Sequence, residues 1–153
     1  MATINTNPKT TAQGKATLID ARGPRFAATL TTLVLALALV THSAVVIAFQ
    51  LVVFAIGAFV GPQKTPYAWI FKNVIKPRLT GDVPTEDVRP PQFAQKIGFL
   101  FAVVALSGSL LSAPVVFTVA TAFALAAAFL NAAFNFCLGC EVYLLITRLT
   151  HRA

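Results

Sequence analysis

The chain has 153 residues, of which 57% are hydrophobic and only 11% are charged. A soluble domain usually carries about 25% charged residues, so the composition argues against a water-soluble protein and indicates one membrane-embedded domain. The net charge of +7 does not indicate a nucleic-acid-binding protein. No charged residue falls within residues 26–61 or 97–139. The sequence therefore leaves no soluble domain that could present a basic surface to nucleic acid.

Residues 1–22 are rich in Thr, Asn, Lys and Gln and predict a disordered polar tail, followed by a membrane domain over residues 23–150. Two apolar runs, at about residues 25–41 and 44–61, have the length of short membrane-spanning helices. The Thr-His-Ser sequence at residues 41–43 suits the turn of a helical hairpin. One continuous helix would overshoot the bilayer, and a cleaved signal peptide does not fit the long polar leader.

An amphipathic helix is predicted at residues 66–77. Apolar side chains recur there every three to four residues, with Lys72 and Lys76 between them. Trp69 is typical of the depth at which the headgroups lie, so we expect this helix to lie in the membrane interface. A proline-rich loop at residues 80–91 follows, and we expect it to be solvated together with its carboxylates, Asp82, Glu86 and Asp87.

Two further apolar runs, at about residues 93–112 and 114–136, predict a second hairpin. The expected fold is therefore an all-α membrane protein with four transmembrane helices in two hairpins plus the interfacial amphipathic helix. The twelve Lys and Arg residues gather in the N-terminal segment, the central loop with its flanks, and the C-terminus. By the positive-inside rule, we expect a multi-pass protein of the plasma membrane with both termini in the cytoplasm.

The two cysteines of the chain, Cys137 and Cys140, form a C-x-x-C motif near the predicted cytoplasmic end of the fourth span. This spacing permits a disulfide and is typical of thiol–disulfide exchange sites, where a helix N-terminus or a cation stabilises a thiolate. We expect Cys137 to be the nucleophile, Cys140 the resolving thiol and Glu141 a proton acceptor. Gly139 is expected to break the helix, so that the second cysteine begins a new one. Two alternatives stay open, namely buried packing cysteines and a metal site with further ligands.

The candidate polar residues within the apolar runs are the amides Gln50, Asn131 and Asn135. The two asparagines share a helix face and are a candidate polar contact near a substrate path. Ordinary hydrogen bonding between helices is the preferred interpretation for all three. The sequence indicates no cofactor and no nucleic-acid partner.

The sequence from Phe129 to Tyr143, FLNAAFNFCLGCEVY, is the most specific of several stretches that resemble one family of small bacterial membrane proteins, domain of unknown function 4395. The other stretches are residues 19–27, 54–62, 66–78 and 91–95. The resemblance covers about residues 18–150 and implies a multi-pass membrane protein without an established activity. The resemblance also implies that relatives often lie beside thioredoxin-like or rhodanese-like proteins, and hence a soluble cytoplasmic partner of that kind.

Three hypotheses for function follow. The first is a membrane thiol–disulfide or sulfur-relay component, which works with a soluble thiol protein or with a quinone reached from the lipid. The second is a non-enzymatic membrane subunit or scaffold with packing cysteines, whose basic surface docks a partner or anionic lipid. The third is a transporter for a small sulfur species, which would need an oligomer because four short spans leave a narrow path.

Overall fold

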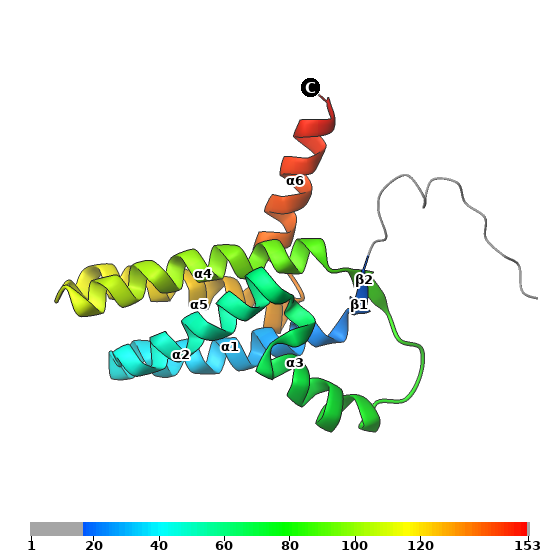
Figure 1. The fold of residues 1–153 in the computed structure, drawn as a ribbon, viewed down its shortest axis with the longest axis horizontal. Coiled ribbons are helices and arrows are strands. Elements are labelled where there is room, and N and C mark those ends of the chain that lie inside the picture. The colour runs from blue at the N-terminus through cyan, green and yellow to red at the C-terminus, as the bar shows by residue number, and fades with distance from the viewer. Residues whose placement is uncertain (1–16, 153) are drawn as a thin grey trace, which may run out of the picture.

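The computed structural model describes residues 17–152, which form an all-α protein with one small sheet. Four helices lie side by side along the long axis of the molecule (Figure 1). Their bounds are α1 Arg22–Thr41, α2 Ala44–Ala55, α4 Arg89–Leu110 and α5 Pro114–Phe134. A π-helical turn, Ile56–Val60, continues α2. The all-α class expected from the sequence is thus confirmed.

Three of these helices, α1, α4 and α5, are long and apolar enough to cross a membrane, with 20, 22 and 21 residues. The apolar helix formed by α2 and its continuation, Ala44–Val60, is shorter than these. Many large apolar side chains of the four helices are exposed, as expected of a surface that faces lipid. The chain is therefore a membrane protein.

Tight turns reverse the chain twice. His42 ends α1 with a left-handed backbone (φ 48°), and the hydroxyl of Ser43 accepts a hydrogen bond from Val46 N–H in the first turn of α2. Ser112 has φ 56° between α4 and α5, and Pro114 occupies the first position of α5. Both turns lie between the apolar runs, as expected from the sequence.

Small residues let the helices approach closely at the centre of the bundle. Helix α1 packs on α5, and α4 packs on both α5 and α2. Ala38 and Ala105 are completely buried there. A Cβ on Gly108 would lie 2.7 Å from the backbone nitrogen of Phe117, so only glycine permits the contact between α4 and α5 at this point.

The expected amphipathic helix begins as α3 (Pro66–Ile70) and continues through a π-helical turn to Arg78. Its inner face buries Tyr67 and Phe71, while Trp69 is 65% exposed. The hydroxyl of Tyr67 donates a 2.7 Å hydrogen bond to Gln50 Oε1, so this helix is attached to α2 by a buried polar contact.

A two-stranded antiparallel sheet joins the two halves of the chain. β1 (Leu18–Asp20) pairs with β2 (Thr85–Asp87), and Ile19 lies opposite Glu86. β1 therefore differs from the disordered tail expected for residues 1–22, of which residues 1–16 lie outside the described residues. β2 lies in the segment expected to be a solvated loop. Neither strand has a local sequence signal, because each consists of three residues that become ordered by pairing with the other.

The same sequence pattern, D-x-R-x-P-x-F-A, follows both strands, at residues 20–27 and 87–94. In each copy the aspartate accepts hydrogen bonds from the backbone N–H and the guanidinium of the arginine two residues later. The phenylalanine of each copy packs on an aromatic ring of a later helix, with centroid distances of 5.7 Å for Phe26–Phe71 and 5.6 Å for Phe93–Tyr143. The two halves are therefore built alike, each with a strand, two apolar helices and an amphipathic helix.

Helix α6 (Leu138–Arg152) is the amphipathic helix of the second half. It runs across the direction of the long helices (Figure 1). None of its residues is buried. Exposed apolar side chains recur along it at a spacing of three to four residues, namely Leu138, Val142, Leu145 and Leu149. This pattern, like that of the segment that begins with α3, is typical of an amphipathic helix.

Candidate functional site around the cysteine pair

The site begins where α5 ends. Asn135 adopts a left-handed backbone (φ 55°), and its N–H donates to the carbonyl of Asn131. Phe136 N–H donates to the carbonyl of Leu130, which completes a tight helix terminus. Asparagine tolerates this backbone better than most residues, since its short polar side chain relieves the steric cost. The helix therefore ends just before the first cysteine.

The next helix begins directly after Cys137, which is bonded to Cys140 as a disulfide. The backbone N–H of Cys140 donates a 3.2 Å hydrogen bond to Sγ of Cys137, and Glu141 N–H donates to the Cys137 carbonyl. Cys137 thus takes the position of an N-capping residue. When the pair is reduced, this N–H and the positive end of the helix stabilise a thiolate at Cys137.

The expectation for Gly139 was wrong in one respect. The helix break lies at Asn135, because that residue supplies the left-handed backbone, and the new helix begins at Leu138 rather than at the second cysteine. Gly139 has another role. A Cβ there would lie 2.6 Å from both Cα and Cβ of Ala94, so glycine lets the first turn of α6 pack directly on α4.

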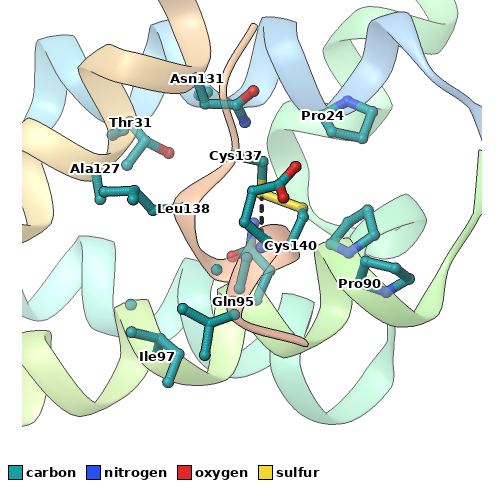
Figure 2. A pocket seen from close by; sticks show the side chains of 18 of the residues that line it. Pro24, Thr31, Pro90, Gln95, Ile97, Ala127, Asn131, Cys137, Leu138 and Cys140 are labelled. Carbon is teal, nitrogen blue, oxygen red and sulfur yellow. Dashed lines mark hydrogen bonds between the residues drawn. A yellow bond between two sulfur atoms is a disulfide. The ribbon is translucent and has the colours of Figure 1, made fainter. Parts of the chain in front are cut away.

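This packing places the disulfide beside a cavity of about 520 Å³ between α1, α4, α5 and α6. Figure 2 shows the disulfide within this cavity, with Asn131, Gln95 and Pro24 around it. The cavity also extends along the bundle to Phe101 and Phe123, two aromatic rings whose centroids are 6.1 Å apart. The disulfide is therefore accessible from a partly open cavity between the helices.

Charged groups line the cavity near the disulfide. Arg25 lines it, and its Nε donates a 3.2 Å hydrogen bond to the Ala132 carbonyl at the end of α5. Glu86 is brought there by β2, and burial raises the pKa of its carboxyl. Glu141, expected from the sequence, also lines the cavity and is exposed. A cation and two carboxylates are thus available for thiolate stabilisation and proton transfer.

Glu86 was missed by sequence reasoning, which assigned it to a solvated loop. Its position depends on the pairing of β1 with β2, and only the repeated D-x-R-x-P-x-F-A pattern could have pointed to it. Asp87, expected to be solvated as well, binds Arg89 instead.

The amide residues named from the sequence lie in two places. Asn131 and Asn135 both line the disulfide cavity, although Asn135 is exposed and serves mainly to end α5. Gln50 lies apart from it, completely buried, where it accepts the hydrogen bond from Tyr67. Its Nε2 has no partner among residues 17–152.

In the same described part of the chain, no three His, Cys, Asp or Glu side chains gather closely enough to hold a metal ion.

Comparison with known proteins gives a family and nothing beyond it. Neither the curated proteins nor the solved structures contain a significant match. A model of one protein family matches residues 19–148, which include both repeated segments, the disulfide and most of α6. The chain therefore belongs to the family described as Domain of unknown function (DUF4395).

Proposed function

We propose that the protein is a membrane thiol–disulfide exchange component that uses the Cys137–Cys140 pair. One observation carries the proposal: the Sγ of Cys137 accepts a hydrogen bond at the start of α6 and faces a cavity lined by ionisable groups. A disulfide that only held the fold together would need neither a thiolate-stabilising donor nor a cavity. Packing cysteines, the alternative, would be surrounded by apolar side chains.

The exchange step transfers two electrons. A thiolate of a partner dithiol attacks Sγ of Cys137, and the Cys137–Cys140 bond breaks to release the Cys140 thiolate. The second partner thiolate then attacks the partner sulfur of the mixed disulfide and releases the Cys137 thiolate. The partner leaves as a disulfide and the protein becomes a dithiol. Glu86 and Glu141 line the same cavity as Cys140, and we assign to them the exchange of protons with its sulfur.

The partner that we propose is a soluble thioredoxin-like or rhodanese-like protein. A rhodanese-like protein would carry a persulfide, whose outer sulfur would pass to Cys137 in a sulfur relay. Both kinds of partner need a reactive cysteine near the membrane surface. The position of α6 in the membrane interface would provide this.

We also propose that the bundle crosses the plasma membrane four times, as two helical hairpins. Ala44–Val60 has 17 residues, a length of about 25 Å at 1.5 Å per residue, which suits a thin or locally adapted bilayer. Among residues 17–152, the Lys and Arg residues lie at the end of the bundle that carries the sheet and α6, or beyond it, and not in the turns at the other end. The positive-inside rule then places the disulfide and both termini in the cytoplasm.

The test compares two single-cysteine variants of the full-length protein, Cys140→Ser and Cys137→Ser, in detergent at pH 7. The remaining thiol is titrated with an aromatic disulfide reagent, and the rate is followed by absorbance. We expect Cys137 to react at least tenfold faster than Cys140, because only Cys137 has a capping N–H. Equal slow rates for both thiols would contradict the proposal and favour packing cysteines.

A second experiment tests whether the protein forms a mixed disulfide with the partner. When oxidised thioredoxin is supplied, the Cys137 thiolate of Cys140→Ser should attack its disulfide and form a mixed disulfide, which accumulates because Cys140, the resolving thiol in this reverse direction, is absent. Cys137→Ser is the matched control, since it has the same number of thiols and should not trap the partner. Trapping by both variants to the same extent would contradict the assigned roles.

A further inference from the structure

We infer that the cavity beside the disulfide binds a lipid-soluble quinone, which accepts electrons from the reduced Cys137–Cys140 pair. This inference rests on the proposed function, because it supplies the oxidant that restores the disulfide. It adds a binding site, its ligand class and a direction of electron flow. Three features carry it: the depth of the cavity, the uncharged character of its inner wall, and its contact with the sulfur atoms.

The cavity extends from the disulfide toward the middle of the bundle. On α4 its lining extends from Ala94, beside Gly139, to Phe101, seven steps or about 10 Å further along the helix. On α5 it runs from Asn131 back to Phe123. Its volume of about 520 Å³ falls in the range of small-molecule sites. A ligand of this site would therefore reach from the interface into the apolar layer.

Small side chains make the inner wall wide enough for a flat ring. Ala124, Ala127 and Ala128 on α5 and Gly98 on α4 all line the cavity, and Gly98 lies against the ring of Phe54 on α2. The cavity is predominantly apolar, and the Phe101 and Phe123 rings lie with an interplanar angle of 26°. A planar ring with an apolar tail fits this lining, since aromatic rings pack well in an offset stack.

Three uncharged polar side chains from three helices interrupt the apolar wall: Thr31 of α1, Gln95 of α4 and Asn131 of α5 (Figure 2). Gln95 Oε1 is buried against Gly57 of the π-helical turn and has no hydrogen-bond partner among residues 17–152, so the Gln95 amide must rotate to present this oxygen to a ligand. Amides and hydroxyls can both donate and accept hydrogen bonds. A quinone needs donors for its carbonyl oxygens and a quinol needs acceptors for its hydroxyl groups, so such side chains suit both redox states. An anionic lipid headgroup would require buried cations instead.

Oxidation of the reduced cysteine pair by a quinone conserves atoms and electrons without any other reactant. One thiolate of the reduced pair attacks a ring carbon of the quinone and forms a carbon–sulfur bond. The second thiolate attacks that sulfur, which forms the Cys137–Cys140 bond and leaves the electron pair on the ring. The two protons of the original thiols end on the two oxygens. The net reaction converts a dithiol and a quinone into a disulfide and a quinol.

The experiment uses the full-length protein in lipid nanodiscs, reduced with dithiothreitol, desalted and kept free of oxygen. Decylubiquinone is added, its reduction is followed by ultraviolet absorbance, and disulfide formation is counted by mass after alkylation. Glutathione at the same thiol concentration gives the rate of the uncatalysed reaction. A parallel assay measures the reduction of the oxidised protein by thioredoxin, which tests the proposed function alone.

Two phenylalanine variants of neighbouring residues test the location. Ala127→Phe places a ring in the cavity, whereas Ala126 is exposed on the outside of α5 and does not line the cavity. We expect Ala127→Phe to lower the quinone rate at least tenfold relative to the thioredoxin rate, and Ala126→Phe to leave this ratio within twofold of wild type. Asn131→Leu, which leaves the space open, should raise the KM for decylubiquinone at least threefold.

The outcomes separate the two proposals. Quinone reduction at least a hundredfold above the glutathione rate, with the expected response of Ala127→Phe, supports the site. Normal exchange with thioredoxin together with quinone reduction at the glutathione rate would overturn the quinone site and leave the proposed function standing. Failure of both assays would overturn both. Equal responses of Ala126→Phe and Ala127→Phe would place quinone reduction outside this cavity.

Discussion

Replacement of Gly139 by alanine tests how the cysteine pair is held against the bundle. The added Cβ would lie 2.6 Å from Cα and Cβ of Ala94, whereas carbon atoms in ordinary contact are about 3.5–4.0 Å apart. Neither Ala94 atom can rotate away, so the first turn of α6 must move by about 1 Å. Overpacking of this kind typically costs about 1–3 kcal/mol, and helix propensity returns at most about 1 kcal/mol.

We therefore expect Gly139→Ala to lower the free energy of unfolding by about 1–2 kcal/mol, which is a few degrees in Tm for a chain of this size. The displaced helix should also weaken the contact between Cys140 N–H and Cys137 Sγ, so that Cys137 of the reduced protein reacts more slowly with a disulfide reagent. Thermal unfolding in detergent and thiol titration measure the two effects.

Gly23→Ala is the matched control. Its Cβ would lie 3.6 Å from the nearest atom of Phe71, which is an ordinary contact, so this variant should be as stable as wild type or slightly more stable. Ala94→Gly in the Gly139→Ala background removes one of the two clashing atoms and should recover part of the loss. A Gly139→Ala protein as stable as wild type, with unchanged Cys137 reactivity, would refute the close contact between α6 and α4.

Three further predictions concern other parts of the structure. Tyr67→Phe removes the donor to the buried Gln50 Oε1 and should cost about 1–3 kcal/mol in chemical denaturation, whereas an unchanged midpoint would contradict this hydrogen bond. Asn135→Val forces a β-branched residue into a left-handed backbone and should cost about 1–2 kcal/mol, while Asn135→Gly should be neutral, both measured by thermal unfolding. Burial raises the pKa of Glu86, so the folded protein holds this proton more tightly and loses stability as the pH rises above about 4.3. Glu86→Gln should therefore raise Tm at pH 7 but not at pH 4, and an equal shift at both values would contradict the burial of the charge.

The long helices could be predicted from the sequence because their cause is local. Uncharged apolar runs of this length become helices in lipid whatever their neighbours are, since only helix formation satisfies their backbone groups there. The expected spans at about 25–41, 93–112 and 114–136 accordingly match α1, α4 and α5 within four residues at each end. The turns and the amphipathic helix at residues 66–77 also follow from local composition.

The internal repeat carries more information than the separate apolar runs. The pattern D-x-R-x-P-x-F-A occurs twice in the sequence and marks the start of both halves. The pattern itself covers only residues 20–27 and 87–94, and the order of elements around each copy in the structure relates α6 to the segment that begins with α3, and β1 to β2.

The sequence by itself determined the membrane helices and the C-x-x-C spacing, because both depend on residues close together in the chain. Only the tertiary structure decided what surrounds the sulfur atoms. Glu86 reaches the cavity through strand pairing, and the cysteines lie against α4 because Gly139 meets Ala94. These contacts join distant segments, and their energy depends on how backbones approach one another in three dimensions, which no single stretch of sequence specifies.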